Sequence, residues 1–200
     1  MNNLQRSEQY PLRRRTVVKQ LLDAMPEALV ITGLGATAWD VTAAGDSPRQ
    51  FPLWGAMGGA AMIGLGLALA QPQRRVLVIT GDGELLMGLG GLATIAVQSP
   101  ANLVLAVIDN ERYGETGMQL THSAYGVDFA AIARGAGFER CFSIADDTDW
   151  ATHLPTLASA DGPLLATIKV RAEVLPLVLP PKDGVTLKDR FRAAILPAET

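Results

Sequence analysis

Cysteine and histidine are scarce in this chain. Its 200 residues include a single cysteine, Cys141, and two histidines, His122 and His153. One cysteine cannot form an internal disulfide and is typical of a reducing compartment, so we expect a cytoplasmic protein. The same scarcity argues against a zinc site and excludes an iron–sulfur centre held by this chain alone.

Strong net charge and long apolar runs are also absent. The formal net charge is −3, which gives no basic footprint for a nucleic acid. The basic cluster Arg13–Arg15 is short, and we expect a solvated helix start there. The N-terminus is polar and charged, so we expect no signal peptide. The apolar run from Gly55 to Ala70 is glycine-rich and shorter than the roughly 20 residues that span a membrane. We therefore expect neither a nucleic acid nor a membrane as partner.

Apolar residues and glycine are plentiful, and their pattern predicts the fold. The chain is 48% hydrophobic and has 20 glycines, which suits a large core with many tight turns. Short β-branched runs predict strands at Ala28–Thr32, Phe51–Trp54, Val76–Thr80, Leu103–Ile108, Cys141–Ile144 and Leu164–Val170. The intervening segments predict helices at Thr16–Met25, Thr37–Ala44, Met57–Ala70, Leu85–Gln98, Asp128–Ala136, Thr148–Ala158 and Thr186–Ile195. This alternation predicts a three-layer α/β/α fold with a mostly parallel sheet.

The same pattern suggests how the chain is divided. Residues 1–24 would form a lead-in helix, residues 25–172 one large α/β domain, and residues 173–200 a tail with a short helix. The prolines between Pro176 and Pro181 predict a break in regular structure at the start of that tail. The segment from Asn110 to Tyr125 is expected to be an ordered loop.

A Gly81-Asp82-Gly83-Glu84 motif stands at the end of one predicted strand, and Asp109-Asn110 stands at the end of the next. A single helix separates these strands, so they should be parallel and should bring Asp82 and Asn110 to the same carboxyl edge of the sheet. Carboxylate and amide oxygens beside glycines suit a Mg²⁺ ion that carries phosphate oxygens. The sequence therefore predicts a magnesium and phosphate site at that edge.

These motifs resemble the signature of the thiamine diphosphate-dependent enzymes, in which GDG is followed one β-α-β unit later by an asparagine. The run Asn110-Glu-Arg-Tyr-Gly-Glu-Thr-Gly-Met-Gln119 strengthens the resemblance. It covers about residues 25–170 and matches the diphosphate-binding (PP) domain of these enzymes. Within the family, the chain resembles the separate small subunit of sulfopyruvate decarboxylases and the C-terminal half of phosphonopyruvate decarboxylases.

The resemblance implies thiamine diphosphate and Mg²⁺ as cofactors and gives roles to individual residues. Asp82, Asn110 and the backbone carbonyl of Arg112 would be the metal ligands. The diphosphate would meet the backbone of Gly83 and Glu84 at a helix N-terminus. Glu84 replaces a small polar residue, so its side chain is expected to point away from the phosphates. Further cofactor contacts are expected from Thr32, Gly33, Gly81, Tyr113 and Gly114.

Gly55-Ala56-Met57 would form the other half of the cofactor site. In the family a bulky apolar residue holds the cofactor in a bent V shape, and Met57 matches that position. The carbonyl of Gly55 would accept a hydrogen bond from the 4′-amino group. The residues alone leave open a simpler interpretation of Met57, as a core residue at the start of an apolar helix.

The resemblance also identifies what this chain lacks. The glutamate that activates the cofactor belongs to a separate pyrimidine-binding (Pyr) domain, and too little chain remains to build one. We therefore expect a Pyr-domain (alpha) subunit as partner, in a hetero-oligomer such as α2β2 or larger. The implied activity is decarboxylation of a small 2-oxo acid to an aldehyde and CO₂, with the chain inactive on its own.

Substrate-facing candidates follow Asn110. Thr116 lies where some of these decarboxylases carry a catalytic acid, and His122 is a second catalytic candidate, although an exposed loop histidine is the alternative. Tyr113, Glu115 and Gln119 are further candidates. The Ser-Arg-Glu-Leu run that often follows the first strand in the phosphonate and sulfonate decarboxylases is replaced by Ala38-Trp39-Asp40-Val41. Without that arginine, the sequence leaves open whether the substrate carries an anionic tail.

Other functions remain compatible with the sequence. Gly33-Leu-Gly-Ala-Thr-Ala38 fits a dinucleotide-binding fingerprint, but no acidic residue ends the second predicted strand as that fold requires. A non-catalytic subunit with the same fold is a second alternative, against which the intact Asp82 and Asn110 argue. A thiamine diphosphate carboligase or oxidoreductase subunit is a third.

Overall fold

A computed structural model describes residues 4–196 of the chain. The strands are β1 Leu29–Thr32, β2 Gln50–Pro52, β3 Val76–Gly81, β4 Leu103–Asp109, β5 Arg112–Tyr113, β6 Gln119–Leu120, β7 Arg140–Ile144 and β8 Leu164–Lys169. The α-helices are α1 Arg14–Ala24, α2 Ala36–Ala44, α3 Ala60–Ala70, α4 Asp82–Met87, α5 Gly91–Gln98, α6 Phe129–Ala136, α7 Asp147–Ser159 and α8 Gly184–Ile195. Two short 3₁₀ helices, η1 Arg6–Gln9 and η2 His122–Tyr125, complete the described elements.

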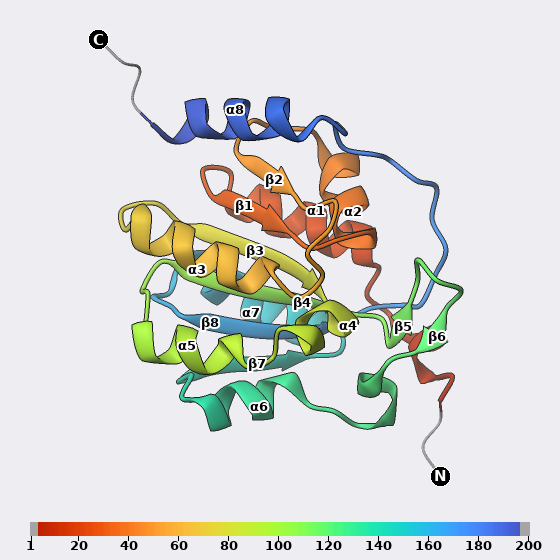
Figure 1. The fold of residues 1–200 in the computed structure, drawn as a ribbon. Coiled ribbons are helices and arrows are strands. Elements are labelled where there is room, and N and C mark those ends of the chain that lie inside the picture. The colour runs from red at the N-terminus through yellow and green to blue at the C-terminus, as the bar shows by residue number, and fades with distance from the viewer. Residues whose placement is uncertain (1–3, 197–200) are drawn as a thin grey trace.

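Six strands form one sheet in the order β2-β1-β3-β4-β8-β7, and every neighbouring pair in it is parallel. Helices cover both faces, with α3, α5 and α6 on the near face in Figure 1 and α1, α2 and α7 behind the sheet. The three-layer α/β/α fold with a parallel sheet is thus confirmed. All carboxyl ends of these strands meet at one edge, where the predicted site residues follow β3 and β4.

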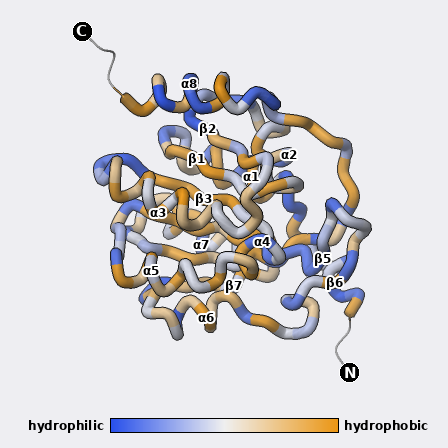
Figure 2. The backbone as a smooth tube through the Cα atoms, in the orientation of Figure 1, coloured by the Kyte–Doolittle hydropathy of each residue, from blue (hydrophilic) through white to orange (hydrophobic). Residues whose placement is uncertain are grey.

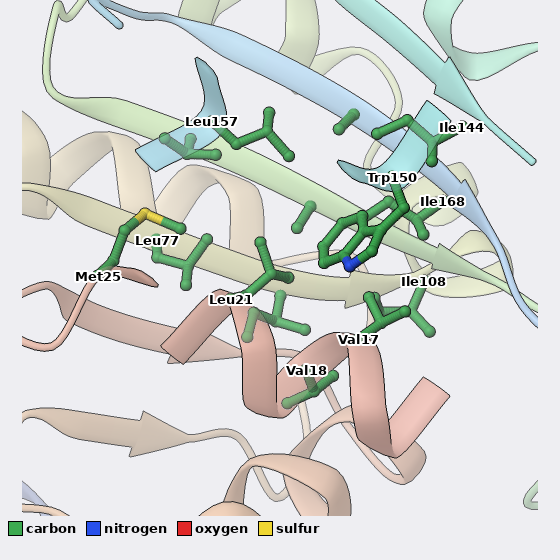
Figure 3. Packing of buried hydrophobic residues seen from close by; sticks show 14 of the residues in the cluster. Val17, Val18, Leu21, Met25, Leu77, Ile108, Ile144, Trp150, Leu157 and Ile168 are labelled. Carbon is green, nitrogen blue, oxygen red and sulfur yellow. The ribbon is translucent and has the colours of Figure 1, made fainter. Parts of the chain in front are cut away.

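Each face of the sheet has its own apolar cluster. Behind the sheet, Val17 and Leu21 of α1 and Trp150 of α7 pack against Leu77 of β3 and its neighbours (Figure 3). The first helix is therefore part of the core of the main α/β unit. On the other face, α3, α5 and α6 contribute to the second cluster. Because the central strands are covered on both faces, they are unbroken apolar runs, and β3 is correspondingly hydrophobic in Figure 2.

The predicted helix Leu85–Gln98 is wrong, because two helices, α4 and α5, occupy this segment. The chain turns at Gly88, where an added Cβ would lie 2.1 Å from the carbonyl oxygen of Gly58. The two backbone segments therefore lie too close together for any residue other than glycine at this position. The helix predicted from Met57 begins later, at Ala60, because Ala56 and Gly58 have the positive φ angles of 57° and 93°.

The segment from Asn110 to Tyr125, predicted as a loop, contains the small antiparallel pair β5–β6 and the 3₁₀ helix η2. The other predicted elements are present, and each of their ends lies within two residues of the predicted position, as is usual where helices and strands begin and end.

The tail leaves the carboxyl edge after β8, runs without helix or strand through residues 171–183, and ends in α8, which packs on the edge strand β2 (Figure 1). Figure 2 shows hydrophobic and hydrophilic residues alternating along α8, as expected of a helix with one buried face. Within residues 4–196 none of the helices has the length and hydrophobicity needed to cross a bilayer.

Candidate cofactor site at the carboxyl edge

The ends of β3 and β4 bring the predicted metal ligands to one cavity. Gly81, the last residue of β3, is in register with Ile108 of β4, so Asp82 and Asn110 follow at the same edge. Both residues line a cavity of about 160 Å³. The predicted site residues that line this cavity are Met57, Gly81, Asp82, Gly83, Glu84, Asn110, Arg112, Tyr113, Gly114 and Thr116.

Asp82 is held by hydroxyl groups on one side only. Its Oδ2 accepts hydrogen bonds from Thr121 Oγ1 and, at 2.8 Å, from Ser123 Oγ, whereas Oδ1 makes no hydrogen bond to another described side chain. Burial, followed by the charge of Asp109, raises the pKa of Asp82 to about 7. A divalent cation at Oδ1 would offset both effects, so the donor set of Asp82 fits a metal ligand.

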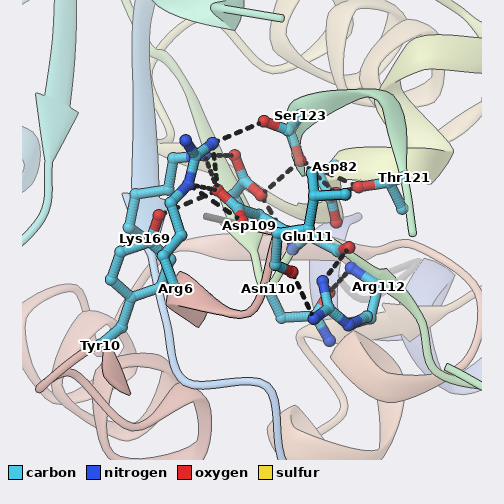
Figure 4. A network of polar contacts seen from close by, with 11 residues as sticks. Arg6, Tyr10, Asp82, Asp109, Asn110, Glu111, Arg112, Thr121, Ser123 and Lys169 are labelled. Carbon is cyan, nitrogen blue, oxygen red and sulfur yellow. Dashed lines mark hydrogen bonds and ion pairs between the residues drawn. The ribbon is translucent and has the colours of Figure 1, made fainter. Parts of the chain in front are cut away.

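A polar network supports the turn that follows β4 (Figure 4). Lys169 Nζ, at the end of β8, is 2.7 Å from Asp109 Oδ2 and 3.0 Å from Glu111 Oε1. Arg6 and Tyr10, from the N-terminal segment, also bind the carboxylate of Glu111. Burial raises the pKa of Glu111, but its bonds to Arg6, Lys169 and Tyr10 outweigh this effect, and the pKa is lowered. Both acidic side chains are therefore buried with their charges compensated.

Asn110 begins a tight turn after β4. Its Oδ1 accepts a hydrogen bond from the backbone N–H of Arg112 at 3.0 Å, and Glu111 between them has a φ of 60°. The Arg112 guanidinium donates to the carbonyl oxygens of Glu111 and Leu4, which ties the turn to the N-terminal segment. An amide oxygen has a second lone pair, so Asn110 could still bind a cation. The expected carbonyl ligand of Arg112 stays a prediction.

Histidine, cysteine and acidic side chains do not gather into a group of three that could hold a metal anywhere in residues 4–196. The predicted site does not need such a group, since it has one carboxylate, one amide and one carbonyl. Hard oxygen donors of this kind suit Mg²⁺ better than a soft transition metal.

Glu84 is buried in the first turn of α4 and packs against Gly33. An added Cβ on Gly33 would lie 1.5 Å from Glu84 Oε2, so only glycine leaves room for this carboxyl group. Thr80 Oγ1 donates to Oε2 at 3.0 Å. Burial raises the pKa of Glu84, although Thr80 and nearby backbone N–H groups act in the opposite direction. Where this side chain lies relative to a diphosphate stays a prediction.

Met57 reaches the cavity from the loop before α3. Its side chain is 37% exposed, and the loop is shaped by the left-handed residues Ala56 and Gly58. Met57 is thus not a core residue, which was the alternative interpretation of the sequence. Gly55 and Ala56 are exposed beside it and do not line the cavity. Their cofactor contacts, and the role of Met57 in the cofactor's shape, stay predictions.

The two other catalytic candidates lie in different places. Thr116 is exposed, lines the cavity and shares hydrogen bonds with Gln119. His122 is exposed at the start of η2 and does not line the cavity. Thr32 and Gly33 are buried at the end of β1, outside the residues lining the cavity. The functional roles of these four residues stay predictions.

Residues that the sequence analysis did not single out complete the cavity and its support. Arg14, Thr37 and Asp40 line the cavity from α1 and α2. The prediction of a solvated start at Arg13–Arg15 is wrong for Arg14, which is 5% exposed because its guanidinium pairs with the buried Asp40 at 2.6 Å. The sequence did carry a signal for the network around Asp109 and Glu111, because Lys169 is a charged residue at the end of the apolar strand β8. Thr121 and Ser123 carried no such signal, since hydroxyl residues are common in loops.

Known proteins resemble this chain over most of its length. Residues 32–168 match the family described as thiamine pyrophosphate enzyme, C-terminal TPP binding domain. The chain is 38% identical over 180 residues to sulfopyruvate decarboxylase subunit beta of Methanothermobacter thermautotrophicus, covering 90% of this chain and 94% of that subunit. It is 36% identical over 176 residues to phosphonopyruvate decarboxylase of Streptomyces hygroscopicus, covering 88% of this chain and 43% of that protein.

A solved structure is similar in fold. It is described as a putative thiamin diphosphate-dependent enzyme from Mycobacterium smegmatis, and it aligns with a TM-score of 0.69 and 24% identity over 82% of this chain and 32% of its own. The chain therefore spans nearly all of that subunit beta and less than half of the phosphonopyruvate decarboxylase and of the Mycobacterium smegmatis protein.

Proposed function

The chain belongs to the thiamine pyrophosphate enzymes, as their C-terminal TPP binding domain, and we propose that it is the cofactor-binding subunit of a two-chain decarboxylase. The substrate would be a small 2-oxo acid of the sulfopyruvate or phosphonopyruvate kind, and the products an aldehyde and CO₂. The observation that carries this proposal is that Asp82 and Asn110, from neighbouring parallel strands, line one cavity.

Within this proposal, Asp82, Asn110 and the carbonyl of Arg112 hold Mg²⁺, and the start of α4 holds the diphosphate. One feature supports the metal assignment, the oxygen of Asp82 that no other side chain binds. When bound, thiamine diphosphate would supply an electron sink for the electrons of the carbon–carbon bond that breaks as CO₂ leaves. Met57 contacts the middle of the cofactor and holds its bent shape, and Tyr113 and Thr116 shape the space in which the substrate lies.

The partner would be a Pyr-domain (alpha) subunit that supplies the activating glutamate, in an α2β2 or larger assembly. Two observations support this part of the proposal. The relative that the chain matches nearly end to end is itself named a subunit beta. The phosphonopyruvate decarboxylase is matched over only 43% of its length, which leaves room there for a further domain.

The first test is to purify the tagged chain from its own host with Mg²⁺ and thiamine diphosphate present, and to identify bound proteins and cofactor by mass spectrometry. We expect a stoichiometric partner and retained thiamine diphosphate. The purified complex should release CO₂ from a 2-oxo acid. Turnover by the chain with no second polypeptide would contradict the proposed subunit arrangement.

A substitution makes the test specific for the metal site. Asp82→Ala should abolish Mg²⁺-dependent retention of thiamine diphosphate after desalting, with the far-UV circular dichroism of the complex unchanged. Asp23→Ala, which removes a 62% exposed carboxylate on α1, is the control and should retain the cofactor. Equal retention in both variants would mean that the metal binds elsewhere.

A further inference from the structure

Two buried donors on one wall of the cavity have no partner. Arg14, at the start of α1, is 5% exposed, and Thr37, in the first turn of α2, is 3% exposed. Neither Arg14 Nε nor Thr37 Oγ1 has a hydrogen-bond partner within the described part of the chain. Buried donors without acceptors are costly, so an acceptor that enters the cavity would be stabilised at this wall.

The charge at this wall is unbalanced. Asp40 is the only carboxylate paired with Arg14 in residues 4–196, and it is shared, because Arg15 Nε also binds it at 3.0 Å. Arg14 uses only its Nη1, which donates to Asp40 and to the carbonyl oxygen of Ala36. It forms no ion pair with Asp82, Glu84 or Glu115, the other acidic residues that line the cavity. Two guanidinium groups and one carboxylate leave one positive charge in excess.

The second cation of the cavity is already committed. Arg112 donates to the carbonyl oxygens of Glu111 and Leu4 and lies 3.8 Å from Glu8. Arg14 is therefore the cation that can bind a ligand in the cavity without giving up a described contact. It lines the same cavity of about 160 Å³ as Asp82 and Asn110.

The anion that fits this arrangement must bind a divalent cation and a guanidinium at once. We propose that Arg14, assisted by the hydroxyl of Thr37, binds the terminal phosphate of the cofactor's diphosphate. This inference rests on the proposed function. An oxyanion held between a metal and an arginine receives charge-assisted hydrogen bonds in addition to the metal–oxygen bonds. Arg14 would also offset the negative charge that Glu84 adds to the cavity.

The test measures binding by isothermal titration calorimetry, with the purified two-chain complex and Mg²⁺. Three ligands are compared, thiamine diphosphate, thiamine monophosphate and inorganic pyrophosphate. Arg14→Gln should raise the Kd of thiamine diphosphate and of pyrophosphate by about tenfold or more, as expected for loss of a hydrogen bond to a charged group. It should leave the Kd of thiamine monophosphate within about twofold, since that ligand lacks the terminal phosphate. Arg14→Lys, which keeps the charge, should lie between wild type and Arg14→Gln.

Arg15→Gln is the matched control, because Arg15 binds the same carboxylate of Asp40 but does not line the cavity. Its Kd values should equal those of the wild type. Equal weakening by Arg14→Gln and Arg15→Gln would overturn the inference, since loosening of α1 from α2 would then explain both. Equal weakening of monophosphate and diphosphate binding by Arg14→Gln would overturn it as well.

The proposed function fails in a different way. A wild-type complex that binds pyrophosphate through Arg14 but not thiamine diphosphate would keep the anion site and overturn the proposed cofactor. A wild-type complex that binds neither ligand would overturn both.

Discussion

Asp109 and Lys169 are register partners at the carboxyl ends of the neighbouring strands β4 and β8, and Lys169 Nζ lies 2.7 Å from Asp109 Oδ2. The Asp109 side chain is fully buried, and that of Lys169 is 21% exposed. Sheet register therefore places a cation directly behind the loop that carries the predicted metal ligands. The same ammonium group also compensates Glu111, so one lysine neutralises two acidic residues.

Replacement of Lys169 by methionine should destabilise the protein strongly. Asp109 and Glu111 would lose a common cation while staying buried, and removal of one partner of a buried ion pair costs about 3 kcal/mol or more. Urea unfolding of the purified protein measures this loss. Lys19→Met is the control, since the Lys19–Asp23 pair is exposed and should change the unfolding free energy by less than about 0.5 kcal/mol. Similar losses in both variants would contradict the supporting role of Lys169.

Met57→Ala should reduce turnover more than cofactor affinity. Met57 lines the cavity and, in the proposed function, contacts the middle of the cofactor, whereas the phosphates are bound elsewhere. Misplacement of a reacting group lowers kcat by roughly tenfold to 100-fold, while the Kd of thiamine diphosphate should change by less than about threefold, a difference of under 1 kcal/mol. Steady-state kinetics and calorimetry separate the two quantities. Met62→Ala removes a side chain that is 39% exposed but outside the cavity, and should leave kcat unchanged. Equal losses of kcat and affinity in Met57→Ala would refute the proposed role.

Two glycines of helix α3 should respond oppositely to alanine. A Cβ on Gly64 would lie 2.2 Å from Val78 Cγ2 of β3, so Gly64→Ala should lower the unfolding free energy by about 1–3 kcal/mol through overpacking. Gly66 is exposed and nothing lies within 4 Å of its added Cβ. Gly66→Ala should instead raise the unfolding free energy by about 0.5–1 kcal/mol, because alanine is the better helix former. Unfolding curves in which both variants shift in one direction would show that α3 does not pack on the sheet as described.

Cys141 should react slowly with thiol reagents near neutral pH. Burial raises the pKa of its thiol, so less of the reactive thiolate is present at a given pH than for a free cysteine. The rate of alkylation at pH 8 should be below that of the same protein in 6–8 M urea, roughly the range that unfolds most domains. It should keep rising with pH beyond the ordinary thiol pKa of about 8.5. Equal rates in the folded and unfolded protein would show that the thiol is not buried as described.

The strands and the metal-site pair were predictable from sequence because their signals are local. A strand buried on both faces is an unbroken apolar run, and β3 and β4 match their predicted ranges to within one residue at each end. A polar residue directly after such a strand must lie at the carboxyl edge of a parallel sheet. The positions of Asp82 and Asn110 at this edge follow from these two facts alone.

Features that depend on contacts between distant segments were not predictable. The break between α4 and α5 arises where the backbone of Gly58 meets Gly88, and no periodicity of the intervening residues reveals that contact. Likewise, Arg14 resembles its two neighbours in sequence. It is buried because α1 packs against α2, where Asp40 lies. The partners of β8 in the sheet, and therefore the position of Lys169 behind Asp109, depend on a strand order that hydrophobic patterns do not determine.

The ion pairs of Glu111 also constrain the order in which the protein can fold during translation. Arg6 precedes Glu111 by 105 positions and Lys169 follows it by 58, so the carboxylate binds both early and late parts of the chain. A ribosome delivers Arg6 first and Lys169 last, and the central strands emerge between them. The turn after β4 is therefore secured only once synthesis has passed β8, and a nascent chain stopped before that point would hold Asp109 and Glu111 without their lysine. The sheet can begin to assemble during translation, but the network behind the turn after β4 is completed only when β8 has been made.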